Sequence, residues 1–208
     1  MIYLRPDPSD DIRQGDIFVA VPRIELSLDS VLVLKDDGYD EETDWESAMA
    51  DTDQPVTIAV AARPTMAIVI TQDCDTVRAD QIALCEIRRL GDVVPDLGST
   101  TARFVNNVRK QSKQNLKWFY LPADSAIGIT EKMAVDFQVS LTVPREQLER
   151  RRGKRIARLN SEADEHFRER LAEFFRRYPV DEWYPFNKDE FEEYKKQAPE
   201  ASPRGWQV

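Results

Sequence analysis

The sequence is poor in the residues that build covalent and metal-based frameworks, with two cysteines and one histidine in 208 residues. Two cysteines form no disulfide framework, and a reduced, cytoplasmic setting is the simplest interpretation. Cys74, Cys85 and His166 lack the spacing of a zinc site, so we expect no metal and no cofactor. The histidine is distant from Cys74 in sequence, which disfavours this thiol as an activated nucleophile.

Long hydrophobic runs are also missing. The most apolar run, Met66 to Ile70, is far shorter than the roughly 20 residues that span a bilayer. The first residues show no basic region followed by an apolar stretch, so we expect no secretory signal and no membrane partner. An apolar content of 41% still supports a core, and the length suits one domain, or one domain with an appendage.

Basic residues are fewer than acidic ones, and the net charge is -9. Residues 36–54 contain nine acidic residues and no basic one, so the rest of the chain is neutral and total charge does not exclude a nucleic-acid partner. This low hydrophobicity predicts a mobile acidic loop. Alternatively, the segment docks through Trp45 on a basic groove of its own chain or of a partner, and so masks a phosphate-binding face.

Apolar patterning predicts a mostly antiparallel β domain. A strand at Met66 to Thr71 reads as central and buried on both faces, with an antiparallel neighbour at Gln81 to Leu90. Pro22 is expected to end its strand or to leave it on an edge, and Arg63-Pro64 is expected to be a break between strands. Further strands are predicted at 17–21, 24–34, 56–62, 116–121 and 133–143.

Helical patterns dominate the C-terminal part, at 145–152, 161–178 and 187–196, and one more helix is expected at 101–114. Ser161 and Asp164 have the spacing of a capping box. The chain is therefore predicted to be α+β. Residues 1–143 are expected to form a small, mostly antiparallel β-barrel or curved sheet, and residues 144–208 a helical extension packed on it.

Three short motifs follow one another in the β region. Gly15-Asp16-Ile17 opens the first strand, Arg63-Pro64 leads into the buried strand, and Gln81 to Leu90 follows as the antiparallel neighbour. This order resembles the MazF/PemK group of small β-barrel proteins over roughly residues 15–143. The chain is similar to larger relatives of that group that carry Gln-Asp-Cys-Asp after the central strand. The resemblance implies a small barrel and a toxin–antitoxin or phage-defence context.

Candidate catalytic residues follow from the same region. In the family that the chain resembles, the arginine of Arg-Pro and a threonine on the following strand serve RNA cleavage; Arg63 fits the first role, but residues 81–90 contain no threonine. Asp73 or Asp75 is predicted to assist Arg63. A divalent cation held by both is an alternative to the expected absence of a metal, because residues two apart on an extended chain face the same side. The plainer alternative is that both carboxylates cap a turn and pair with an arginine such as Arg78 or Arg88, with Cys74 packed as a small buried residue.

Two basic blocks, 103–117 and 145–158, mix cations with asparagine or aromatic residues, as phosphate contact and base stacking require. The alternative is that they are solvated faces or docking sites for the acidic loop. His166 is expected at the boundary of an apolar helix face. The predicted nucleic-acid contacts are Arg103, Asn107, Arg109, Lys110, Lys113, Lys117, Arg151 and Arg155.

Two functions remain open on this evidence. The first is a non-catalytic binding or regulatory module that contacts RNA, DNA or a protein partner, and that can form a homo-oligomer. The second is an endoribonuclease, or another nuclease, of the same lineage. The missing threonine, the single histidine and the acidic net charge favour the binding module.

Overall fold

The computed structural model describes residues 2–35, 38, 40–50, 55–93, 101–110, 116–176 and 188–203. The chain divides into two compact units, Met1–Phe174 and Phe175–Val208. The second unit contains the helix α7 (Lys188–Lys195), in which Phe191 is buried. Among the described residues, no helix is long and apolar enough to cross a membrane.

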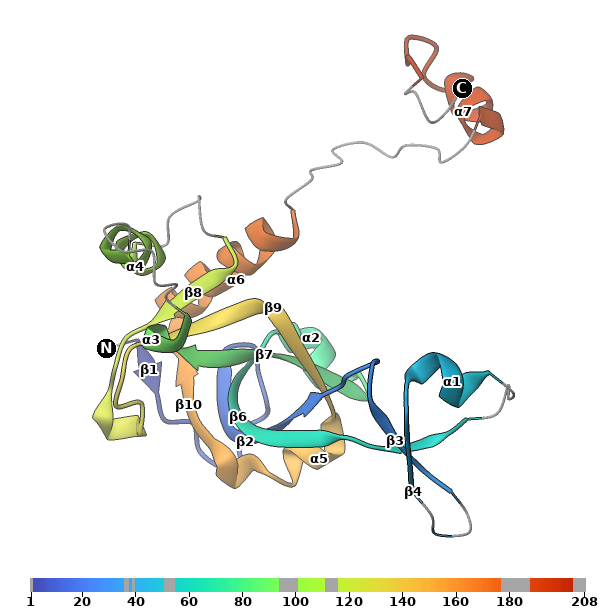
Figure 1. The fold of residues 1–208 in the computed structure, drawn as a ribbon. Helices are drawn as coiled ribbons and strands as arrows, with labels where there is room; N and C mark the ends of the chain where they lie inside the picture. The colour runs from blue at the N-terminus through green and yellow to red at the C-terminus, as the bar shows by residue number, and fades with distance from the viewer. Residues whose placement is uncertain are drawn as a thin grey trace. The chain divides into compact units, whose positions relative to one another are not determined.

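A curled, seven-stranded antiparallel sheet forms the centre of the larger unit (Figure 1). Its spatial order is β1-β10-β2-β6-β7-β9-β8. The sheet and its helices confirm the predicted mixture of a curved antiparallel sheet with helices. The strands are β1 (Tyr3–Leu4), β2 (Asp16–Glu25), β6 (Ala61–Val69), β7 (Gln81–Arg89), β8 (Trp118–Leu121), β9 (Met133–Pro144) and β10 (Arg155–Leu159).

The central strand and its antiparallel neighbour are confirmed. Strand β6 lies between β2 and β7, Ile68 is opposite Cys85, and Ile68 and Val69 are fully buried. The predicted strand end at Pro22 and the break at Arg63-Pro64 are wrong, because Pro22 and Pro64 face each other inside the β2–β6 ladder. The edge alternative for Pro22 is confirmed, since β10 pairs with β2 only at residues 16–18. Opposite residues in alternate pairs of an antiparallel ladder exchange no hydrogen bonds. A proline pair at such a position costs the sheet no donor.

The predicted division at residue 143 differs from the structure. Strand β10, from the part expected to be helical, enters the sheet between β1 and β2, so the sheet needs residues beyond 143. The next helix, α6 (Ser161–Phe175), packs on the sheet through Ala163, Phe167 and Leu171. The ring of Phe167 meets that of Phe119 on β8 edge-on, with their centroids 5.2 Å apart.

The opposite face of the sheet is covered at its two ends. At one end Leu148 of α5 (Arg145–Glu149) packs with Phe18 and Leu84. At the other end Val108 of α4 (Thr101–Arg109) packs with Trp118. The remaining short elements are α2 (Asp73–Thr76), α3 (Leu90–Val93), and the 3-10 turns η3 (Ser125–Ile127) and η4 (Arg152–Lys154).

A second, smaller sheet replaces much of the predicted acidic loop. It consists of β3 (Val31–Leu34), β4 (Asp40–Thr43) and β5 (Thr57–Ala59), in the order β4-β3-β5, and it carries the helix α1 (Trp45–Met49). The Asp44 side chain caps α1 by accepting from the backbone N–H of Ser47 at 2.8 Å. The prediction of a mobile loop is therefore wrong for residues 40–50; residues 36, 37, 39 and 51–54 lie outside the described part.

Gly15 should be intolerant of a side chain. Its φ is +82°, and an added Cβ would lie 2.9 Å from the Asp164 Oδ1 atom. Replacing Gly15 with alanine should lower the free energy of unfolding by about 1–3 kcal/mol, because it combines left-handed backbone strain with a collision. Urea unfolding of the variant measures this loss.

Gly128→Ala is the matched control, since Gly128 has a φ of +83° and no atom within 4 Å of an added Cβ. It should show the backbone strain alone and thus the smaller loss. Equal losses for the two variants would mean that the contact with Asp164 has no energetic weight.

Candidate functional site

Two buried carboxylates lie side by side on the sheet face that α6 leaves uncovered. Glu86 on β7 and Asp136 on β9 are cross-strand partners, and their side chains are 2% and 3% exposed. Glu86 is two residues from Leu84 on β7, and Asp136 is two residues from Ala134 on β9, so each pair lies on one face of the sheet. Leu84 packs under α5, and Ala134 packs with Trp118. Buried carboxylates need cationic or hydrogen-bonding partners.

Glu86 obtains its partners from β2 and β6. The Nη2 atom of Arg63 donates to Glu86 Oε1 at 2.6 Å, and the Thr65 hydroxyl donates to the same oxygen at 3.0 Å. Arg23, which is the cross-strand partner of Arg63, pairs with the other oxygen. Arg63 also donates to Glu25 at 2.7 Å. Hydrogen bonds to Glu86 and Glu25 raise the pKa of the Arg63 guanidinium.

Asp136 lies beneath two further cations. Arg88 Nη1 and Lys117 Nζ are each 3.8 Å from Asp136 Oδ2, and the backbone N–H of Gln138 donates to Oδ1 at 3.1 Å. Lys117 also donates to Gln138 Oε1 at 2.8 Å and stands 4.4 Å from the ring centre of Trp118. Trp118 is buried, so it offers no ring surface on which a nucleobase could stack.

We call Arg23, Arg63, Arg88 and Lys117 the cation face. Their side chains are between 27% and 42% exposed, whereas the carboxylates beneath them are almost completely covered. The acids are arranged to hold the cations in place, and the outer donors of the cations remain accessible to solvent. Four cations stand against Glu86, Asp136 and the exposed Glu25, so this face keeps an excess of one positive charge, which suits an anionic ligand with phosphate-like groups.

The structure brings part of the predicted nucleic-acid set to this face. Lys117 belongs to the cation face, and α4 is attached beside it through the packing of Val108 with Trp118. Arg151 is exposed after α5, which covers the other end of the same sheet face. The predicted residues on or beside α4 are Arg103, Asn107, Arg109 and Lys110, while Lys113 lies outside the described residues.

Arg155 leaves the predicted set, because its side chain is 1% exposed and pairs with the fully buried Asp16 at 2.9 Å. It also donates to the backbone carbonyls of Asp7, Asp10 and Asp11. Arg158 pairs with the other Asp16 oxygen at 2.6 Å. These arginines attach the first residues of the chain to β2 and β10. They are thus structural and unavailable to a ligand.

The segment Gln72-Asp73-Cys74-Asp75 adopts the short helix α2 where an extended chain was expected. Asp73 accepts from the backbone N–H of Gln14 and from Arg168, each at 2.8 Å. It therefore pairs with an arginine, as the plainer alternative required, but the arginine is Arg168 and not Arg78 or Arg88. Asp75 is exposed, and no group of three or more metal-ligating side chains occurs in the described residues. Arg63 is near the beginning of β6 and Asp73 follows its end, so the structure does not bring the predicted catalytic residues together.

The two thiols differ from each other. Cys74 is exposed, so the expectation that it packs as a small buried residue is wrong. Cys85 is buried in the core, and burial raises the pKa of its thiol to about 12. His166 is exposed on α6.

Asp164 shares Arg168 with Asp73. Its Oδ2 atom accepts from Arg168 at 2.8 Å, whereas its buried Oδ1 atom, beside Gly15, has no hydrogen-bond partner among the described residues. The helix cap predicted for Ser161 is supplied instead by Asn160, which accepts from the backbone N–H of Ala163 at 2.9 Å. Burial raises the pKa of Asp164, aided by the charge of Asp73 and opposed by Arg168 and Arg158.

Sequence reasoning missed two residues of the cation face, Arg23 and Arg88. It also missed the groups beneath that face, namely Glu86, Asp136 and Thr65. A signal was present, because Glu86 and Asp136 each interrupt an otherwise apolar strand segment, Cys85-Glu86-Ile87 and Val135-Asp136-Phe137. A charged residue between two apolar strand residues indicates either a side chain that points to solvent or a buried ion pair. The sequence pattern is the same in both cases, and only the tertiary structure distinguishes them. Comparison with protein-family models, curated proteins and solved structures found no significant match.

The raised pKa of Asp164 predicts a pH dependence. A carboxyl whose pKa is higher in the folded than in the unfolded chain favours folding increasingly as the pH falls from the raised pKa toward the ordinary value of 3.8. The unfolding free energy of the unsubstituted protein, relative to Asp164→Asn, should therefore increase between pH 7 and about pH 4. Denaturant unfolding of both proteins over this range measures the difference.

Glu165→Gln, at an exposed position of the same helix, controls for the general effect of removing an acid. Its difference from the unsubstituted protein should not follow that of Asp164→Asn. A constant or decreasing difference for Asp164→Asn would contradict the burial of its carboxyl.

Proposed function

We propose that the chain is a non-catalytic binding module whose cation face holds the phosphate backbone of RNA or DNA. The observation that carries the proposal is the arrangement of four half-exposed cations over the buried pair Glu86 and Asp136. Fixed guanidinium groups lose little conformational entropy when they bind phosphate oxygens. Arg103 and Arg109 of α4, and Arg151 after α5, are exposed on elements that pack at the two ends of the same sheet face.

The contact chemistry favours the backbone over the bases. The buried Trp118 ring, covered by Lys117, provides no stacking platform, and arginine and lysine can pair with phosphates of any sequence. Binding should therefore depend strongly on salt and weakly on sequence.

We also propose that the sheet is MazF/PemK-like. In support, Gly15-Asp16-Ile17 leads into β2, Arg63-Pro64 lies in its neighbour β6, and β7 follows as an antiparallel strand. A toxin–antitoxin or phage-defence context follows from the resemblance alone and stays a prediction.

An endoribonuclease is the second candidate, and one observation favours it. Thr65 and Arg63 hydrogen-bond to the same Glu86 oxygen, so β6 itself supplies a threonine beside the arginine, although β7 has none. Against this candidate, Arg63 is bound by both Glu86 and Glu25. An arginine that is neutralised by two carboxylates is a weaker stabiliser of a phosphate transition state.

Gel-shift titration with labelled single-stranded RNA and DNA, with and without Mg²⁺, tests the proposal. The unsubstituted protein should shift both, and Arg88→Ala and Lys117→Ala should each weaken binding. Each should also reduce the slope of log affinity against log salt by about 0.7, the value for one lost contact to a single-stranded backbone. Circular dichroism verifies that the variants fold.

Arg89→Ala is the matched control. Arg89 follows Arg88 on β7 but points to the other face, where it pairs with Glu131, and its side chain is 62% exposed. This control removes the same charge and should leave affinity and salt slope nearly unchanged. Equal loss in all three variants, or no shift at all, would overturn the proposed binding face. Cleavage that disappears in Arg63→Ala would establish the nuclease instead.

A further inference from the structure

Large exposed hydrophobic side chains concentrate in one part of the chain. Of nine such residues among the described ones, six lie between residues 24 and 60. Isolated exposed hydrophobic residues are ordinary on a protein surface, but a concentration of them marks a contact site. The six are Ile24, Leu26, Leu28, Leu34, Trp45 and Val60, which are between 37% and 60% exposed.

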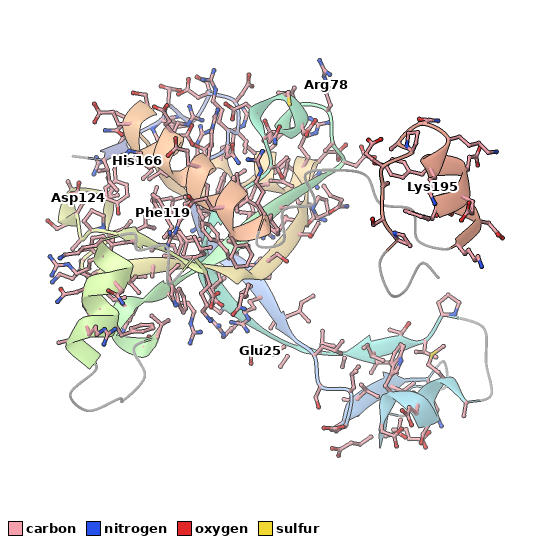
Figure 2. The ribbon with its side chains drawn as sticks, turned by 90° about the horizontal axis from the view of Figure 1, so that it is seen from above. Glu25, Arg78, Phe119, Asp124, His166 and Lys195 are labelled. Carbon is pink, nitrogen blue, oxygen red and sulfur yellow. The ribbon has the colours of Figure 1, made fainter. Side chains whose placement is uncertain are left out.

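Leu34 belongs to the small sheet and Trp45 to its helix α1, and Ile24 lies near the end of β2. The other three lie in the segments that connect the small sheet to β2 and β6. The backbone N–H of Trp45 donates to the Leu28 carbonyl at 2.9 Å, which brings these two side chains into the same region. Alternation along β3 places Leu32 and Leu34 on one face, and Ala59 on β5 is opposite Leu32. Figure 2 shows Glu25, the last residue of β2, where the chain leaves the seven-stranded sheet for the small sheet.

The same region carries the negative charge of the protein. Residues 24–62 contain eleven acidic residues and one basic residue, Lys35, although the whole chain has a net charge of only -9. Lys35 pairs with Glu41, so the nearby cation is already engaged by one acid. Glu42 and Glu46 are exposed, and the excess of acids has no matching cations within this region.

The small sheet also presents strand edges. In the part of the chain that the structure describes, β4 and β5 are the outer strands of this sheet, and each pairs only with β3. An outer strand can accept a further extended segment through its free backbone groups.

We propose that the small sheet with its flanking segments, over the described residues 24–35, 40–50 and 55–62, is a docking surface for a basic, amphipathic segment of another protein, in which lysines or arginines alternate with apolar residues. The apolar side chains of such a segment would cover Leu26, Leu28 and Leu34, and its cations would meet the surrounding acids. The proposal does not depend on nucleic-acid binding by the cation face.

The negative charge of the docking surface favours a basic amphipathic segment over a nucleic acid or a second copy of the chain. A nucleic acid is repelled by the acids of this region, seven of which belong to its described residues, and a second copy would bring the same acids if like surfaces met. The cation face of a second copy has matching charge, but its residues Arg23, Arg63, Arg88 and Lys117 offer no exposed apolar side chains to cover the leucines. A basic amphipathic segment satisfies both requirements.

A short synthetic peptide of alternating lysine and leucine is the probe, and its binding to the full-length protein is measured by fluorescence anisotropy. Two variants remove the two halves of the surface: Leu26→Ser with Leu28→Ser and Leu34→Ser, and Glu41→Gln with Glu42→Gln and Glu46→Gln. Each should weaken binding by roughly tenfold or more, since each deletes one of the two complementary terms. The glutamine variant should also flatten the dependence on salt.

Matched controls carry equivalent changes elsewhere. Leu4→Ser with Val77→Ser removes exposed apolar side chains, and Glu162→Gln with Glu165→Gln removes exposed acids on α6. These controls should bind the peptide as the unsubstituted protein does, and peptides that alternate glutamate with leucine, or lysine with serine, should bind weakly.

Equal affinity of the unsubstituted protein and the two small-sheet variants would overturn the proposal. It would also be overturned if light scattering found a dimer that the leucine variant abolishes, because the occupant would then be a second copy. Loss of nucleic-acid binding in Arg88→Ala concerns the cation face alone and leaves this proposal unaffected.

Discussion

The buried contact of Asp16 with Arg155 and Arg158 is the interaction on which the larger unit depends. It joins β2 to β10 and, through the carbonyls that Arg155 and Arg158 bind, to the first residues of the chain. A fully buried carboxylate without its cations would be strongly unfavourable, so this contact favours one arrangement of strands over its alternatives. With β10 fixed beside β2, α6 follows directly and covers one face of the sheet.

Buried carboxylates also need cationic partners on the face of the sheet that α6 leaves uncovered, but there the cations are not buried. Glu86 and Asp136 are as well buried as Asp16, but the cations that neutralise them come from the rim and remain partly exposed. Two covered acids therefore organise four accessible cations. The arginines that pair with Asp16 stabilise the fold and are unavailable to a ligand. The residues of the cation face are positioned by the buried acids and stay available to a ligand.

Charge is segregated along the chain as well as paired within it. The acidic excess is confined to the small sheet and its connections, and the remainder of the chain is slightly basic. A protein of this kind can present a phosphate-binding face and a surface for basic partners without one cancelling the other. The two proposed surfaces adjoin each other along β2 and β6, where Arg23 and Arg63 precede the pairs Ile24–Ala62 and Glu25–Ala61. Among the described residues of the acidic region, Glu25 pairs with Arg63 of the cation face.

The sequence by itself determined the local structure. The apolar run Met66–Ile70 specified a buried central strand, alternation specified β7 and β9, and helical spacing specified α6, because these patterns depend on neighbours a few residues apart. Only the tertiary structure decided which charged residues are ligand-facing and which are buried. Arg155 and Lys117 are alike in sequence, each a cation in a basic block. Arg155 is buried against Asp16, which is 139 residues away in the sequence. Lys117 stays half-exposed because it precedes β8, which is at the edge of the sheet. Pairing between distant strands creates this difference in burial, and local sequence patterns do not encode it.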